Sequence, residues 1–339
     1  MTASITAGAR TLWAPRHGVL EHVRSEELLA AALSGVVANA SVSPEDVKLL
    51  LVACDTGVGA QGLNVGRRTA SALGWDEVPA LTVDGQGVGD LGLLGIAASL
   101  IGNADATGSD AVVVAAVDST TTVPPGAGLV RDYGRPTIDA PRQLVLEQLA
   151  REAGLTRADL DTEAQRVLQH YPVLPPHSGM VPVGAEGLRA DVGVEIDLDA
   201  ADLLPLNGDD GLITAYHEAP LADGAAAVVV QHRGVGGREL HGWLQAHSSQ
   251  ALVGALRSIA ASEPQMVLAD PSMVTHCLVA GSRHDQLAPV RAVGNTPSAN
   301  GLRMVVDALH LTTTATTVVS IGEHGQLGRV TVGPADGLP

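Results

Sequence analysis

The residues best placed to do chemistry lie in a glycine-rich turn around Gly87, directly after a predicted strand at Ala80–Val83. An apolar helix and a second buried strand, Ala111–Val117, follow the turn. Many α/β enzymes mount a nucleophile where a strand breaks sharply into a helix, because the turn presents one side chain at the positive end of that helix. Here the turn presents Gln86 and Gly87, and neither can attack a carbonyl. The stretch therefore predicts a nucleophile elbow without a nucleophile.

Polar residues in the second half of the chain could also do chemistry, and each has a plainer interpretation. Asp270 could be a general base, or a turn residue and helix N-cap. Asn295 could donate to an oxyanion, or could be a loop residue that tolerates an unusual backbone. Ser320 stands at a strand end, where a structural role is the alternative. His324 beside Glu323 could form an acid/base pair, or could be an exposed turn residue.

Neither a nucleotide-binding motif nor a metal motif is present in the sequence. The glycines at 85–89 read G-x-G-x-G, which differs from the dinucleotide-binding spacing. The glycine-rich loop Gly57–Gly62 is followed by no lysine that would mark a phosphate-binding P-loop. His170, His177 and His217 are spaced too irregularly for a metal site. We therefore expect no metal and no required cofactor.

Composition narrows the classes of partner. The chain has 339 residues, is 45% hydrophobic, and contains only 2% aromatic residues and no Phe. Its formal net charge of −17 disfavours binding to nucleic acid or to anionic membranes, whose phosphates would be repelled. No apolar run approaches the roughly 18 residues of a membrane span. Two cysteines, Cys54 and Cys277, suggest no disulfide framework and suit a reducing cytoplasm. We expect a cytoplasmic protein that contacts neither nucleic acid nor membrane.

Strand and helix patterns alternate on both sides of the elbow. From Val47 to Ser119 the alternation predicts a mostly parallel sheet covered on both faces. Regularity breaks at about residues 120–213, where two helices, Pro141–Ala153 and Arg157–Gln169, precede a proline- and glycine-rich excursion. Alternation then resumes, so the sequence predicts an α/β fold of two duplicated halves. These are residues 1–232, with an insertion at about 120–213, and residues 238–339.

Five stretches, in matching order, resemble the thiolase superfamily, and thiolases proper more than ketosynthases. They are Gly62–Arg68 (GLNVGRR), Pro79–Ala98, Arg142–Gln169, Thr214–Val228 (TAYHEAPLADGAAAV) and Ser298–Leu309 (SANGLRMVVDAL). Together they span most of the chain. The resemblance implies a thiolase-like five-layered αβαβα fold, in which two equivalent halves pack together and a loop domain is inserted in the first. It also implies dimerisation through the sheet of the first half.

The same resemblance places altered residues at the reactive positions. The cysteine that carries the acyl group as a thioester corresponds to Gly87, or to Gln86 if the alignment moves by one residue. The water-holding Asn corresponds to Asp270, and the histidine of the GHP motif to Asn295. The second cysteine corresponds to Ser320. The resemblance therefore implies that the covalent chemistry of the family is lost.

Positions that would contact a coenzyme A (CoA) thioester differ as well. The serine that touches the pantetheine arm in thiolases corresponds to Ala219, and His324 occupies a turn that is glycine-only in that family. Arg142 could bind the CoA phosphates, as could four other arginines in the insertion: Arg151, Arg157, Arg166 and Arg189. A CoA thioester could thus serve as a ligand without being a required cofactor.

Three functions remain open at this stage. The first hypothesis is a thiolase-like protein without the nucleophilic cysteine, acting as a non-catalytic or acyl-thioester-binding partner subunit. It would form a homodimer, or a hetero-oligomer with a catalytic thiolase- or ketosynthase-type subunit. The second is an active acyl-CoA C-acyltransferase without a covalent cysteine intermediate, with Asn295 and amides near Gly87 as oxyanion donors and His324 or Asp270 as base. The third is a scaffold with no thioester ligand.

Overall fold

The computed structural model describes residues 3–103, 110–125, 127, 142–170, 176–184, 186–193, 203–232, 237–246, 248–261, 266–269, 272–280, 293–322 and 325–334. The strands are β1 Ala3–Arg10, β2 Ala14–Pro15, β3 Val47–Ala53, β4 Ala80–Val83, β5 Ala111–Ser119, β6 Ala222–His232, β7 Arg238–Ala246, β8 Met266–Ala269, β9 Thr316–Ile321 and β10 Gln326–Val332. The helices are α1 Ser25–Ala40, α2 Val65–Ala72, α3 Gly89–Asn103, α4 Arg142–Ala153, α5 Arg157–His170, α6 Ser249–Ala261, α7 Met273–Ala280 and α8 Asn300–Leu311. Short 3-10 turns are η1 Pro44–Asp46, η2 Gly59–Gln61 and η3 Ala215–His217.

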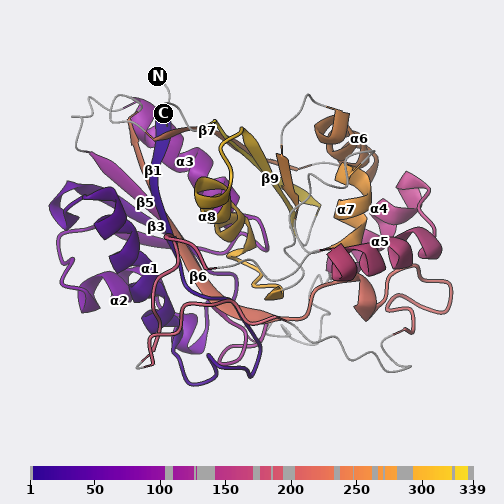
Figure 1. Ribbon diagram of the computed structural model, residues 1–339, viewed down its shortest axis with the longest axis horizontal. Coiled ribbons are helices and arrows are strands. Elements are labelled where there is room, and N and C mark those ends of the chain that lie inside the picture. Colours follow the sequence, from indigo (N-terminus) through magenta and orange to yellow (C-terminus); the bar gives the residue numbers. More distant parts are fainter. Residues whose placement is uncertain are drawn as a thin grey trace, which may run out of the picture.

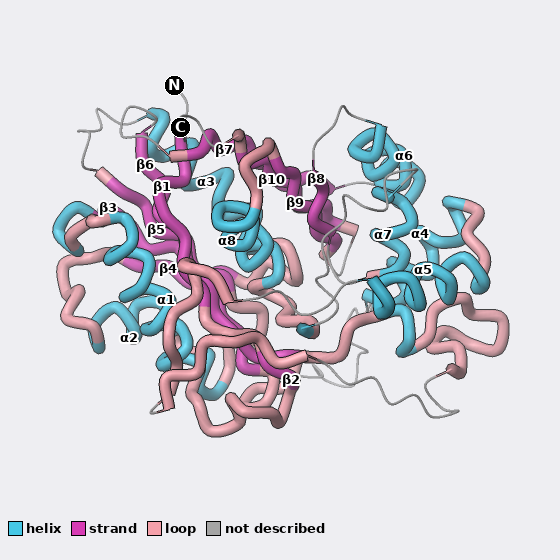
Figure 2. The backbone as a smooth tube through the Cα atoms, viewed as in Figure 1, coloured by secondary structure: helices cyan, strands magenta, loops and turns pink. Residues whose placement is uncertain are grey.

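The described strands form one continuous mixed sheet in the order β4-β3-β5-β6-β1-β7-β10-β9-β8, and β2 pairs with β6 (Figures 1 and 2). The two halves of this sheet repeat one topology. In the first half β3 and β5 are parallel, whereas β5–β6 and β6–β1 are antiparallel. In the second half β8 and β9 are parallel, whereas β9–β10 and β10–β7 are antiparallel. The expected duplication is therefore confirmed.

The expectation of a mostly parallel sheet is wrong for the molecule as a whole. Parallel pairing joins β3 to β4 and to β5, which is the segment on which the expectation was based. β6 returns after the insertion and runs antiparallel to β5, and β1 is antiparallel to both β6 and β7. Helical crossovers force neighbouring strands to be parallel, but a strand that returns through a long insertion is under no such constraint.

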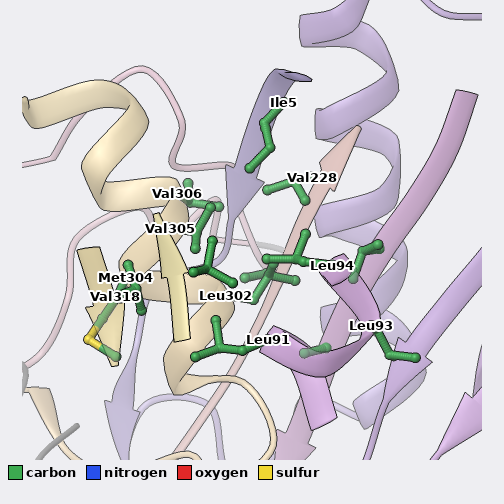
Figure 3. Packing of buried hydrophobic residues seen from close by; sticks show 14 of the residues in the cluster. Ile5, Leu91, Leu93, Leu94, Val228, Leu302, Met304, Val305, Val306 and Val318 are labelled. Carbon is green, nitrogen blue, oxygen red and sulfur yellow. The ribbon is translucent and has the colours of Figure 1, made fainter. Parts of the chain in front are cut away.

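Two helices, α3 and α8, lie between the two halves of the sheet, with further helices outside each half (Figures 1 and 2). One apolar cluster joins both inner helices to both halves of the sheet, and includes Leu94 of α3, Leu302 of α8, Val228 of β6 and Val318 of β9 (Figure 3). A second cluster packs α1 and α2 against the outer face of the first half. A third cluster packs the four helices α4, α5, α6 and α7 against the outer face of the second half. The expected five αβαβα layers are thus confirmed.

The central layer depends on two glycines that make room for Leu91 of α3. A Cβ on Gly301 would lie 2.6 Å from Leu91 Cγ, and a Cβ on Gly328 would lie 3.1 Å from Leu91 Cδ1. Leu91 is fully buried, so α3 approaches both α8 and β10 through positions that carry no side chain. This close packing fixes the start of α3, and hence the turn that precedes it.

Candidate functional site

The turn between β4 and α3 contains Gly85 and Gly87, and the space around these two glycines differs. A Cβ on Gly85 would collide with the Cα of Gly89, so this position requires glycine. Gln86 and Gly87 both have left-handed backbones, with φ of 50° and 89°. A Cβ on Gly87 would meet nothing closer than the Cα of Gly322 at 3.5 Å, an ordinary contact. Position 87 therefore has space for a side chain on the strained backbone that is typical of a nucleophile elbow.

The end of β9 lies directly against this elbow. The buried Ser320 donates its hydroxyl to the carbonyl oxygen of Gly87 at 3.1 Å. A Cβ on Gly322 would lie 2.7 Å from the carbonyl oxygen of Gln86, so only glycine fits there. The amide of Gly322 donates to the carbonyl oxygen of Gln326 at 2.9 Å, within the β9–β10 hairpin. The structure therefore brings the predicted residues Gln86, Gly87 and Ser320 together.

Asp55, which the sequence interpretation missed, accepts two amides of the elbow. Its Oδ1 accepts the amide of Gly85 at 3.1 Å, and its Oδ2 accepts the amide of Gly87 at 2.6 Å. Between them, the amide of Gln86 donates to Asp84 Oδ1 at 3.1 Å. Three successive amides of the elbow are therefore bonded to carboxylates of the same chain.

A second acid, Asp118 at the end of β5, lies beside Asp55. It is buried, and its Oδ2 accepts both the amide of Ser298, at 2.8 Å, and the hydroxyl of Ser298. Burial raises the pKa of Asp118 to about 6, although its bonds to Ser298 act in the opposite direction. Burial, and then the charge of Asp118, raise the pKa of Asp55 well above its usual range. Two neighbouring carboxyl groups of this kind resist simultaneous ionisation.

Asp90 ties the first turn of α3 to the first turn of α8. The side chain is fully buried, and its two oxygens accept the amides of Leu91 and Leu302, each at 2.7 Å. Burial raises the pKa of Asp90 to about 7, in spite of these amide bonds. Carboxylates are favourable at helix N-termini, so one acid here serves two helices.

Both cysteines are poor candidates for a thiolate. Cys54 is 1% exposed, and its Sγ lies 3.8 Å from Asp118 Oδ1. Burial and then the charge of Asp118 raise the pKa of the Cys54 thiol far above its ordinary value. On α7, burial and then the charge of Glu163 raise the pKa of Cys277 to about 12. Both side chains are therefore neutral thiols near pH 7, and a thiol is a weak nucleophile.

Asn295 pairs with Leu221 through a short parallel bridge. The Asn295 amide donates to the carbonyl oxygen of Pro220 at 2.7 Å, and its carbonyl oxygen accepts the amide of Ala222 at 2.8 Å. Its side-chain Oδ1 accepts a hydrogen bond from Asn300 Nδ2. The structure thus places Asn295 against residues 220–222, which directly follow Ala219, and Ser298, three residues after Asn295, binds Asp118.

Of Arg142, Asp270 and His324, only Arg142 lies in the part of the chain that the structure describes. Arg142 Nε lies 3.3 Å from Glu218 Oε2, and its guanidinium also donates to the carbonyl oxygen of Ile321. Arg142 is therefore next to the end of β9 and is engaged by protein groups. Asp270 and His324 lie outside the described residues.

Of the three histidines singled out in the sequence, His177 and His217 contact different acids, and the side chain of His170 lies outside the description. His177 Nε2 lies 3.1 Å from Asp307, and His217 Nε2 lies 2.8 Å from Asp161. Within the described ranges, no group of three or more His, Cys, Asp or Glu side chains could hold a metal ion. Across the same ranges, no helix is long and apolar enough to cross a membrane.

Comparison with known proteins points to one family. The thiolase N-terminal domain family matches residues 3–131. The chain is 26% identical over 264 residues to the 3-ketoacyl-CoA thiolase of Bacillus subtilis, and 28% identical over 267 residues to a probable acetyl-CoA acetyltransferase of Mycobacterium tuberculosis. Each alignment covers 68% of this chain and 66% of the relative, so the matched part is just under two thirds of each relative's length.

Solved structures extend the likeness of fold to nearly the whole chain. The crystal structure of human mitochondrial 3-ketoacyl-CoA thiolase superimposes with a TM-score of 0.78 and covers 98% of both chains, at 16% identity. The structure of that enzyme in complex with CoA gives the same values. At this level of identity the likeness concerns the fold alone.

Proposed function

We propose, from the premise that the chain belongs to the thiolase superfamily, that it has lost the covalent acyl transfer of that family. In this proposal it acts as a non-catalytic or acyl-thioester-binding partner subunit of an acyltransferase or ketosynthase system. The observation that carries the proposal is Gly87, which has space for a side chain and lies against Ser320 and Gly322, yet carries none. Thioester formation requires a nucleophilic side chain at such a position.

The other groups near the elbow support the proposal. Cys54 is the nearest cysteine along the chain to β4, but it is buried, and the same burial raises the pKa of its thiol. The amides of Gly87 and Gly322 already donate to Asp55 and to the carbonyl oxygen of Gln326. Amides engaged in this way are poor donors to a developing oxyanion, because a bond must first be broken.

We further propose that the chain forms a homodimer, or a hetero-oligomer with a cysteine-bearing subunit, through the first half of its sheet. β4 is at one end of the described sheet order and pairs only with β3. Leu81 on this strand is 54% exposed. An edge strand with an exposed leucine can receive a strand from another subunit.

The second candidate is an acyl-CoA C-acyltransferase that works without a covalent cysteine intermediate. The relative named as a probable acetyl-CoA acetyltransferase and the acid beside the elbow favour it. With its pKa raised to about 6 by burial, Asp118 could exchange a proton near neutral pH. Asn295 would then serve as an oxyanion donor.

Turnover of acetyl-CoA and acetoacetyl-CoA by the purified chain separates the two candidates. We expect no saturable turnover from the chain alone, and co-elution with a cysteine-bearing thiolase or ketosynthase on size-exclusion chromatography. Saturable turnover by the chain alone, abolished in Asn295→Ala, would contradict the partner role. A rise in Tm with millimolar CoA would identify CoA as a ligand, because binding to the native state alone stabilises it.

A further inference from the structure

The elbow has the geometry of an anion-binding concavity. Gln86 and Gly87 have left-handed backbones, and the amides of residues 85, 86 and 87 all point at carboxylate oxygens. Successive amides in such a turn bind anions, and the N-terminus of α3, a helix of fifteen residues, adds positive potential. The amides that could bind a ligand's negative charge are therefore already bound to acids of this chain.

Asp55 accepts the amide of Gly87, which is the amide most important for acyl transfer. When a nucleophile attacks a thioester from position 87, negative charge develops on the carbonyl oxygen next to the elbow. Amides beside the nucleophile normally stabilise that charge. The Gly87 amide instead lies 2.6 Å from Asp55 Oδ2. The Asp55 side chain therefore takes the hydrogen-bond donor that would stabilise the developing charge.

We propose that Asp55 is an internal occupant of the elbow, and that it blocks acyl transfer independently of the missing side chain at Gly87. The inference rests on the proposed loss of covalent chemistry and deepens it, because it assigns a second and separate block to the site. A thiol restored at position 87 would then remain unable to accept an acyl group until Asp55 is removed.

The chain offers a matched control in Asp84. This carboxylate belongs to the same elbow and accepts the amide of Gln86 at 3.1 Å, but it binds neither Gly85 nor Gly87. It is the same residue type, within the same turn. Removing Asp84 therefore deletes an acidic side chain from the elbow without freeing the amide of position 87.

The experiment compares Gly87→Cys alone with Gly87→Cys combined with Asp55→Ala, Asp55→Asn or Asp84→Ala. Two rates are measured for each: acetylation by acetyl-CoA, followed by intact-mass spectrometry, and alkylation by iodoacetamide. In acetylation the introduced thiolate attacks the carbonyl carbon and the electron pair moves to oxygen. Collapse of this intermediate expels CoA thiolate, which takes a proton from solvent. Alkylation forms no oxyanion, so the ratio of the two rates removes differences in thiolate fraction.

We expect Asp55→Ala to raise the ratio of acetylation to alkylation by about 100-fold or more, the size of effect that one oxyanion donor gives. Asp84→Ala should leave it within about threefold. Asp55→Asn keeps the shape and one acceptor oxygen, so its ratio of acetylation to alkylation should be intermediate. This variant replaces Asp55→Ala in the comparison if Asp55→Ala does not fold. An unchanged ratio in the Asp55 variants overturns the inference. The inference is also overturned if iodoacetamide does not alkylate the thiol introduced at position 87. Saturable turnover by the unmodified chain would instead overturn the proposed function.

Discussion

Asp90 Oδ2 accepts the amide of Leu302 at 2.7 Å, which fixes the first turn of α8 to the first turn of α3. The elbow precedes α3, and the loop that contains Asn295 and Ser298 precedes α8. This buried carboxyl group, together with the bonds of Ser298 to Asp118, therefore holds the two segments in register.

That carboxyl group makes stability depend on pH. Burial raises the pKa of Asp90 from 3.8 to about 7 in the folded state. Between these values the unfolded chain has lost the proton and the folded chain has kept it, so the unfolded state binds fewer protons and stability falls as pH rises. Burial shifts the pKa of Asp118 in the same direction.

We therefore expect the free energy of unfolding to be higher at pH 5 than at pH 8, by on the order of 2 kcal/mol from Asp90. Urea titrations at the two pH values measure this difference. In Asp90→Asn the difference should shrink, because residue 90 no longer titrates. A variant whose stability keeps the full dependence on pH would show that other groups produce it.

The buried ion pair between Arg10 and Asp191 should be essential for stability. Arg10 of β1 is fully buried and binds both oxygens of Asp191, at 2.7 and 2.8 Å. Asp191→Ala removes one of the two carboxylates bound to the buried guanidinium and leaves Asp307 at 2.6 Å as the other, so we expect a loss of about 3 kcal/mol in chemical denaturation. The exposed pair Arg24–Glu26 is the control, and Arg24→Ala should cost at most about 1 kcal/mol. Similar losses for both would refute this account of Asp191.

Two glycine-to-alanine changes in helices should have opposite effects. Gly301→Ala in α8 places a Cβ 2.6 Å from Leu91 Cγ, and overpacking of this kind costs about 1–3 kcal/mol. Gly254→Ala in α6 places a Cβ where no atom lies within 4 Å, and should stabilise by about 0.5–1 kcal/mol through helix propensity. Thermal unfolding of both variants checks the prediction. A stable Gly301→Ala protein would mean that the central layer is looser than described.

The native thiols should react slowly. Burial raises the pKa of Cys54 and, together with Glu163, that of Cys277, so both lack thiolate at pH 7.5. We expect a thiol-disulfide reagent to label the folded protein far more slowly than the protein in denaturant, and Cys54→Ser assigns the two rates. Rapid labelling of native Cys54 would place a reactive thiol near the elbow and weaken the proposed function.

The sequence by itself determined the elements with strong local signals. The spacing of apolar residues and glycines predicted β4, the elbow and α3, and the resemblance predicted the five-layered fold and the altered residues Gly87, Asn295 and Ser320. It did not predict β1, Ala3–Arg10, whose sequence ASITAGAR has little intrinsic preference for a strand. β1 is a strand because β6 pairs along one side of it and β7 meets its start on the other.

Only the tertiary structure decided which acids reach the elbow. Asp55 precedes Gly85 by thirty residues, and no local pattern connects them. Parallel pairing of β3 with β4 sets Ala53 opposite Val83, so the residues after both strands meet at one edge of the sheet. Pairing of β3 with β5 brings Asp118 to the same edge. The sequence shows Asp55 and Asp118 near the ends of two strands. Strand order, which depends on long-range packing, places these two acids together next to the elbow.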